Sequence, residues 1–213
     1  MILLRRGKLM LETGNQALND YIMQRFQGFI QDNQKEKKGG IVFAGDSITE
    51  FFPLKKYLGR DHHLINRGIA GTDTVWLQEH LAEQVLAVEP SKVFLSIGTN
   101  DIGREYPKQE TIERFSQIIS QIKSNNPFVQ IYLLSIFPVN ESVDYQEKVK
   151  IRTNQAIQSL NQDLSQLPGV EFIDLYPLLL DKDGQLAANL TTDGLHLTMP
   201  AYEIISKKLA LYL

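Results

Sequence analysis

The sequence contains no cysteine, so the chain can form neither a disulfide framework nor a thiolate metal site. It also lacks an apolar run long enough to cross a membrane. The short apolar stretch Met1-Ile2-Leu3-Leu4 precedes Arg5-Arg6, which reverses the order of a secretory signal. We therefore expect a cytoplasmic protein that does not insert into a membrane.

A large excess of charge of one sign is missing as well, because the net charge is only −3. This value gives no reason to expect a nucleic-acid partner. The few histidines do not form a metal-binding pattern: His62 and His63 are adjacent, and His80 is not part of a His-Glu-x-x-His motif. We expect a protein without a metal and without a cofactor.

What the chain does have is a regular alternation of short apolar segments and helical patterns. Its 213 residues, 43% of them apolar, suit one domain with a substantial core. The predicted strands are apolar on successive residues, which is typical of strands buried on both faces of a parallel sheet. They cover residues 41–44, 64–66, 93–97, 129–135 and 170–173. The alternation predicts an open α/β sheet covered by helices on both sides.

Four further segments show helical spacing of their apolar residues. Thr72 or Asp73 is expected to cap the first of them. The predicted helices cover residues 77–88, 112–122, 149–164 and 200–213.

The first 39 residues precede the first predicted strand and are assigned to an N-terminal arm and helix, with residues 40–213 as the main domain. Leu18, Ile22, Phe26 and Phe29 form an apolar stripe, and Gly39-Gly40 is expected to stop that helix. We expect the helix to pack on the domain, with residues 1–11 as a strap. A homodimer contact is the alternative use of this segment.

Polar blocks follow the predicted strands. Gly45-Asp46-Ser47 follows the first strand, residues 66–71 the second, and residues 98–101 the third. Residues 193–196 lie between the last strand and the last helix. Ligands of open α/β sheets gather at the carboxyl ends of the strands, so these blocks are expected to meet in one crevice.

The residue types in these blocks suit nucleophilic acyl transfer. Ser47 is the candidate nucleophile, and His196 is the candidate general base, because a histidine can accept and return a proton near neutral pH. Asp193 is expected to hold the imidazole in the productive tautomer. The alternative is that Asp193 only caps the final helix while His196 packs as a neutral side chain.

An oxyanion would need hydrogen-bond donors. Ser47 and Gly71 can supply backbone N–H groups, and Asn100 can supply its carboxamide NH₂. The alternative is that Gly68 and Gly71 only form turns and that the side chain of Asn100 only stabilises its loop.

In these four blocks the chain resembles the SGNH (GDSL) hydrolase family, and it is especially similar to catalytic subunits of the intracellular platelet-activating-factor acetylhydrolase type. The resemblance covers residues 40–213 and implies a three-layer α/β/α, flavodoxin-like sheet of five parallel strands. It also implies a catalytic Ser47, Asp193 and His196, with an oxyanion hole of Ser47, Gly71 and Asn100. Ile48 stands where the family usually has leucine.

The expected function is that of a serine esterase acting on a small acyl ester, with acetyl as the expected acyl group. The main alternative is a non-catalytic binding module for an acylated sugar or lipid on the same fold. Flavin binding is disfavoured because Glu50 follows the first strand and would repel a phosphate. Residues after the strand ends that could wall an acyl pocket, or equally belong to the core, are Phe51, Phe52, Ile102, Tyr106, Phe137 and Pro138.

Overall fold

The computed structural model describes residues 16–213 and contains a five-stranded sheet in the order β2-β1-β3-β4-β5. Every pairing is parallel, which confirms the predicted sheet. Each strand lies within two residues of its predicted bounds. The strands are β1 (Ile41–Gly45), β2 (Leu64–Gly68), β3 (Lys92–Ser96), β4 (Gln130–Leu134) and β5 (Glu171–Ile173).

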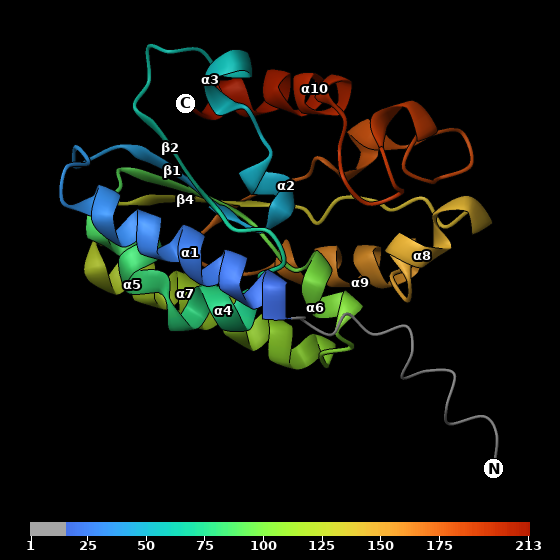
Figure 1. The fold of residues 1–213 in the computed structure, drawn as a ribbon, viewed down its shortest axis with the longest axis horizontal. Coiled ribbons are helices and arrows are strands. Elements are labelled where there is room, and N and C mark those ends of the chain that lie inside the picture. Colours follow the sequence, from blue (N-terminus) through green and yellow to red (C-terminus); the bar gives the residue numbers. More distant parts are fainter. Residues whose placement is uncertain (1–15) are drawn as a thin grey trace.

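Helices cover both faces of the sheet, giving the three-layer arrangement seen in Figure 1. One face is covered by α4 (Thr74–Glu79), α5 (Leu81–Gln84), α7 (Lys108–Asn125) and α9 (Asn154–Leu164). The other is covered by α2 (Ser47–Glu50), α3 (Leu54–Tyr57) and α10 (Met199–Leu209). The remaining helical elements are α1 (Gln16–Asn33), α6 (Thr99–Gly103), α8 (Gln146–Val149), η2 (Leu86–Val88), η3 (Val143–Tyr145), η4 (Tyr176–Leu179), η5 (Ala188–Leu190) and η6 (Ala210–Tyr212).

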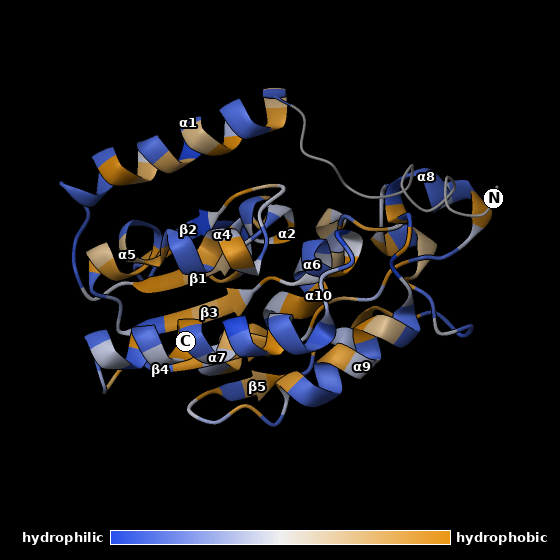
Figure 2. Ribbon diagram, turned by 90° about the horizontal axis from the view of Figure 1, so that it is seen from below, coloured by the Kyte–Doolittle hydropathy of each residue, from blue (hydrophilic) through white to orange (hydrophobic). Residues whose placement is uncertain are grey.

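The two helical layers explain why the strands are apolar throughout. Successive side chains of a strand point to opposite faces of a sheet. In β1, Val42 and Ala44 pack under α4, α5, α7 and α9, whereas Ile41 and Phe43 pack under α3 and α10. Figure 2 shows β1 and β3 as mostly hydrophobic, next to helices that carry both hydrophilic and hydrophobic residues. No helix within residues 16–213 is both long and apolar enough to span a membrane.

The helix α1 lies outside these layers and packs against α5 and the loop after β2. Its buried residues Ile22, Phe26 and Phe29 form a small cluster with Ile69. The predicted stop at Gly39-Gly40 was wrong: α1 ends at Asn33, and residues 34–40 form turns that lead into β1. The predicted strap, residues 1–11, lies outside the described residues.

Two predicted helices are interrupted. The segment 77–88 is split between α4 and α5 at His80, whose ring stacks on Trp76 and whose Nδ1 lies 2.9 Å from the Trp76 carbonyl oxygen. The segment 149–164 is broken at Lys150, and α9 begins only at Asn154, after the N-cap Thr153. In both cases the apolar spacing continues across the break.

Candidate active site

Ser47 is the first residue of α2, placed there by a sharp change from strand to helix. The Asp46 carboxylate caps α2 by accepting a hydrogen bond from the Ile48 N–H at 2.9 Å. Gly45 leaves no space for a side chain, since an added Cβ would lie 1.9 Å from the Ser96 carbonyl oxygen. The β1–α2 junction thus presents Ser47 at the carboxyl edge of the sheet.

Ser47, His196 and Asp193 form one hydrogen-bonded chain. His196 Nε2 lies 3.0 Å from Ser47 Oγ, and His196 Nδ1 lies 2.7 Å from Asp193 Oδ2. Asp193 Oδ1 accepts a hydrogen bond from the His196 backbone N–H at 2.8 Å. These contacts give each imidazole nitrogen a partner and fix the ring plane. The arrangement can pass a proton from the serine hydroxyl to the imidazole.

The electrostatics of Asp193 favour an ionised carboxylate. Partial burial alone would raise its pKa, but the hydrogen bonds from the His196 side chain and backbone outweigh burial and hold the pKa well below its usual range. The carboxylate therefore keeps its charge at neutral pH and stabilises a positive charge on His196.

The loop that carries this pair is held by close packing. Gly194 has a φ of +82°. An added Cβ there would lie 2.5 Å from Tyr145 Cβ and 2.9 Å from Val149 Cγ2. Glycine is thus required both for the backbone conformation and for the contact between this loop and the η3–α8 segment.

Asp46, next to Ser47, is 2% exposed. Burial raises its pKa to about 7, even though the hydrogen bond from Ile48 opposes the change.

This shift makes the stability of the fold depend on pH. An unfolded aspartate titrates near pH 4, so between about pH 4 and 7 the native state retains a proton that the unfolded state loses, and the free energy of unfolding falls as the pH rises. Asp46→Asn keeps an acceptor for Ile48 and should stabilise the protein at about pH 8 by up to about 4 kcal/mol, with a smaller gain at about pH 5. Urea denaturation at both pH values tests this, and an equal gain at both would contradict it.

Three candidate hydrogen-bond donors, on Ser47, Gly71 and Asn100, line one pocket. Within residues 16–213, the backbone N–H groups of Ser47 and Gly71 donate no hydrogen bond. The Asn100 carboxamide nitrogen donates to the Thr72 carbonyl oxygen at 2.8 Å, which leaves its second N–H available. Gly71 has a φ of +83°, a conformation that favours glycine. The predicted donors therefore lie in one place and could stabilise an oxyanion together.

Arg152 holds the Asn100 carboxamide in orientation, and the sequence analysis missed it. Arg152 is 1% exposed; its Nη2 donates to Asn100 Oδ1 at 3.0 Å and its Nε donates to the Thr99 carbonyl oxygen at 2.9 Å. Gly103 makes room for the guanidinium, because an added Cβ would lie 2.2 Å from Arg152 Nη2. Since Arg152 has only donors, it fixes which end of the amide faces it and directs the NH₂ group of Asn100 away.

Glu50 connects the loop after β2 to α2, the helix that begins at Ser47. Its carboxylate accepts a hydrogen bond from the Ala70 N–H at 2.6 Å and pairs with Arg25 of α1 at 3.3 Å. Arg25 Nε also donates to the Gly68 carbonyl oxygen at 2.6 Å. The helix α1 therefore supports the loop that presents Gly71.

A pocket of about 360 Å³ opens over Ser47. It brings together Ser47, Gly71, Asn100 and His196, as the strand-end positions predicted. Of the proposed acyl-pocket walls, only Phe51 lines this pocket, and it is 49% exposed. Phe52 and Phe137 are buried in the core beside α10, whereas Ile102 and Tyr106 line other cavities. Within the described part of the chain, the other lining residues are Leu18, Ala70, Arg104, Lys148, Lys150 and Leu195.

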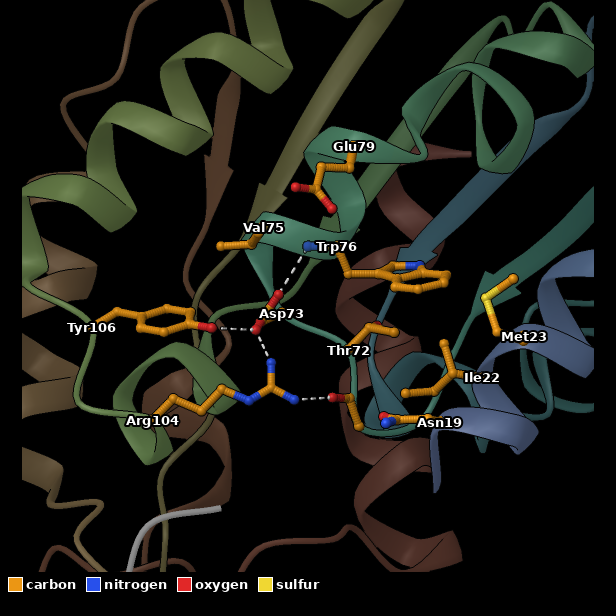
Figure 3. A pocket seen from close by; sticks show the side chains of 11 residues that line it. Asn19, Ile22, Met23, Thr72, Asp73, Val75, Trp76, Glu79, Arg104 and Tyr106 are labelled. Carbon is orange, nitrogen blue, oxygen red and sulfur yellow. Dashed lines mark hydrogen bonds and ion pairs between the residues drawn. The ribbon is translucent and has the colours of Figure 1, made fainter. Parts of the chain in front are cut away.

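A second pocket, of about 340 Å³, adjoins the first, with Gly71 and Arg104 common to both. Figure 3 shows the Asp73 carboxylate at its centre, paired with Arg104 and accepting a hydrogen bond from Tyr106 Oη at 3.1 Å. Arg104 also donates to the Gly71 carbonyl oxygen at 2.7 Å and so forms the partition between the two pockets. Its charge is compensated by Asp73. Within residues 16–213, no cluster of acidic side chains and histidines could hold a metal ion.

The chain is similar to several known proteins. The GDSL-like Lipase/Acylhydrolase family pattern matches residues 43–204. Platelet-activating factor acetylhydrolase IB subunit alpha2 of Gallus gallus is 25% identical over 90% of this chain and 82% of its own length. A solved structure from Streptococcus pneumonia, provisionally described as a platelet activating factor, is 38% identical. It superposes with a TM-score of 0.88, covering 92% of this chain and 94% of that one.

Another relative is a longer protein. The N-acylneuraminate cytidylyltransferase of Escherichia coli is 31% identical over 84% of this chain. The chain spans only 41% of that relative's length, so this similarity concerns part of the relative.

Proposed function

The chain belongs to the GDSL-like lipase/acylhydrolase family of carboxylic ester hydrolases, and we propose that it hydrolyses short-chain acyl esters. Acetyl esters are the preferred substrates, and the reaction passes through an acyl-Ser47 intermediate. The observation that carries the proposal is the hydrogen-bonded chain from Ser47 Oγ through His196 to Asp193. Residues 40–213 would form the catalytic domain, with residues 1–39 as its N-terminal extension. The substrate is a small ester.

Acylation begins with Ser47 Oγ attacking the ester carbonyl carbon while His196 Nε2 takes the hydroxyl proton. Asp193 stabilises the imidazolium that forms. When the tetrahedral intermediate collapses, the bond to the alcohol breaks and His196 returns the proton to the leaving oxygen. Water then attacks the acyl-Ser47 carbonyl with His196 again as base, releasing the carboxylic acid and restoring the serine.

The negative charge on the tetrahedral intermediate would be stabilised by the backbone N–H groups of Ser47 and Gly71 and by the Asn100 amide. All three donors are held before the substrate binds: Ser47 by the helix start, Gly71 by the loop that Glu50 anchors, and Asn100 by Arg152. Donors that need no reorganisation contribute most to transition-state stabilisation.

Asn100→Ala should lower kcat by about 10²- to 10³-fold while changing KM much less, because the amide contact develops mainly in the transition state. Steady-state kinetics on a soluble acetyl ester measure the two constants separately. Asn126→Ala, in the turn after α7, is the matched control. An unchanged kcat would remove Asn100 from the oxyanion hole.

Two features support a short acyl group. The pocket over Ser47 is about 360 Å³ and must hold both halves of the ester. The relative from Gallus gallus is named an acetylhydrolase. The test is a series of 4-nitrophenyl esters of increasing acyl length, with mass spectrometry of the Ser47 peptide after rapid quenching. We expect kcat/KM to be highest for acetate and the Ser47 peptide to carry acetyl. A preference for long acyl chains, or acylation of another residue, would contradict the proposal.

A further inference from the structure

Two lysines line the pocket over Ser47 and have no role in the proposed hydrolytic mechanism. Lys148, at the end of α8, and Lys150, just after it, both line this pocket. Both side chains are half-buried, and neither makes an ion pair within the described part of the chain. Among residues 16–213 the two ammonium groups therefore have no carboxylate partner and can interact with an anion in the pocket.

No acidic side chain offsets these lysines inside the pocket. Among residues 16–213, its lining contains no aspartate and no glutamate. The third cation of the lining, Arg104, is already neutralised by Asp73, as Figure 3 shows. The Asp193 carboxylate is hydrogen-bonded to the His196 imidazole. The pocket is therefore positively charged in a chain whose net charge is −3, and a cleft with this local field concentrates anions.

The lysines belong to the segment that packs on the loop of His196. The η3–α8 segment packs directly on the loop of His196, through the contacts of Tyr145 and Val149 with Gly194. His196 Nε2 must reach the leaving oxygen to protonate it. Groups beside the His196 loop therefore face the alcohol half, whereas the acyl carbonyl is directed to the donors at Gly71 and Asn100.

The backbone that carries the lysines is fixed and strained. Lys150 has φ 56° and ψ −117°, an unusual conformation for a residue with a side chain. Two residues later, Arg152 is bonded to Thr99 and Asn100. Strained backbone that its surroundings hold in place is typical of functional sites. The contacts of Arg152 with Thr99 and Asn100 thus hold the backbone near Lys150 in a fixed position relative to Asn100.

We propose that Lys148 and Lys150 form a subsite for an anionic group on the alcohol half of the ester, so that the preferred substrates are acyl esters of carboxylate- or phosphate-bearing alcohols. The inference rests on the proposed function and narrows its substrate class. A lysine ammonium provides three donors and a compact charge that suits either anion.

The test compares three acetyl esters that differ in the group opposite the ester: 4-acetoxybenzoate, 4-acetoxyphenyl phosphate and the neutral 4-acetoxybenzamide. The measured quantity is the ratio of kcat/KM for each anionic ester to that for the neutral ester, which cancels effects common to both. The wild type should prefer an anionic ester, and the preference should weaken as salt is added. The carboxylate and phosphate arms show which anion the subsite favours.

Lys148→Gln and Lys150→Gln should each lower this ratio by about three- to tenfold, and the double variant should lower it further. Lys148→Arg with Lys150→Arg keeps the charge and should retain most of the preference. Lys208→Gln, on the exposed face of α10, is the matched control and should leave the ratio unchanged. Thermal denaturation of each variant checks that it is folded.

Two results would overturn the inference and leave the esterase proposal intact. One is an unchanged ratio of kcat/KM values in the folded Gln double variant. The other is a wild type that hydrolyses the three esters without preferring an anionic one. A wild type that hydrolyses none of the esters and whose Ser47 cannot be acylated would contradict the esterase proposal itself, and the inference with it. The two failures are therefore distinguishable.

Discussion

Ser47→Ala is expected to lower kcat for acetyl ester hydrolysis by at least about 10⁴-fold, because the variant has no nucleophile that could form the acyl intermediate. The fold should be unaffected, since the only side-chain hydrogen bond of Ser47 within residues 16–213 is the one with His196. Steady-state kinetics at saturating ester, with circular dichroism to check the fold, measure both quantities.

The rate that remains in Ser47→Ala measures the contribution of the rest of the site to catalysis. Ser116→Ala, on the exposed face of α7, is the matched control and should retain wild-type kcat. A Ser47→Ala variant that kept more than about a tenth of wild-type kcat would contradict the role of Ser47, because even partial loss of such a catalytic unit costs far more.

Asp193→Asn is expected to lower kcat by about 10⁴-fold, the second of the largest effects. In the wild type, Asp193 Oδ1 accepts hydrogen bonds from the backbone N–H groups of Leu195 and His196 at 3.1 and 2.8 Å. The amide oxygen of the variant can still accept both. Its NH₂ group would then face His196 Nδ1 and turn that nitrogen into an acceptor. The proton would move to Nε2, and the imidazole could no longer take the proton of Ser47.

Asp183→Asn, in an exposed turn, is the control for the same chemical change. It should leave kcat unchanged, and urea denaturation should give similar stability for both variants if the loop of Asp193 is preserved. Should Asp193→Asn retain wild-type kcat, the carboxylate would have only a capping role. That outcome would favour the alternative that the sequence left open for this pair.

The sheet could be predicted from sequence because each strand carries its own signal. Val93-Phe94-Leu95, for example, is apolar on successive residues, and in the structure all three side chains are buried. The helix breaks could not be predicted in this way. At His80 and at Lys150 the apolar spacing continues across the break, so the periodicity gives no sign of it.

That Ser47, Gly71, Asn100 and His196 share one pocket could be predicted because these residues lie in loops at the carboxyl edge of the sheet. The residues that hold them in place could not. Arg152 lies 52 residues from Asn100 in sequence, and nothing around it marks it as buried. Glu50 was interpreted only as a charge that would repel phosphate, whereas its contacts with Ala70 and Arg25 anchor the loop of Gly71.

The lysines of the pocket were missed for a related reason. Lys148 directly precedes the predicted helix 149–164 and Lys150 lies within it, and charged residues of a helix normally face solvent. Only the break at Lys150 and the packing of α8 beside the His196 loop bring them to the pocket. Functional residues on irregular segments are the ones that periodicity describes least well.

The most direct test of the catalytic proposal is labelling with a small fluorophosphonate, followed by peptide mass spectrometry, in the wild type and in His196→Ala. The probe reacts with an activated serine and requires no knowledge of the natural substrate. We expect a single adduct on Ser47 in the wild type and its loss in the variant, because the serine hydroxyl needs the imidazole as base. No adduct in the folded wild type, or equal labelling of Ser47 in both proteins, would contradict a working serine–histidine pair.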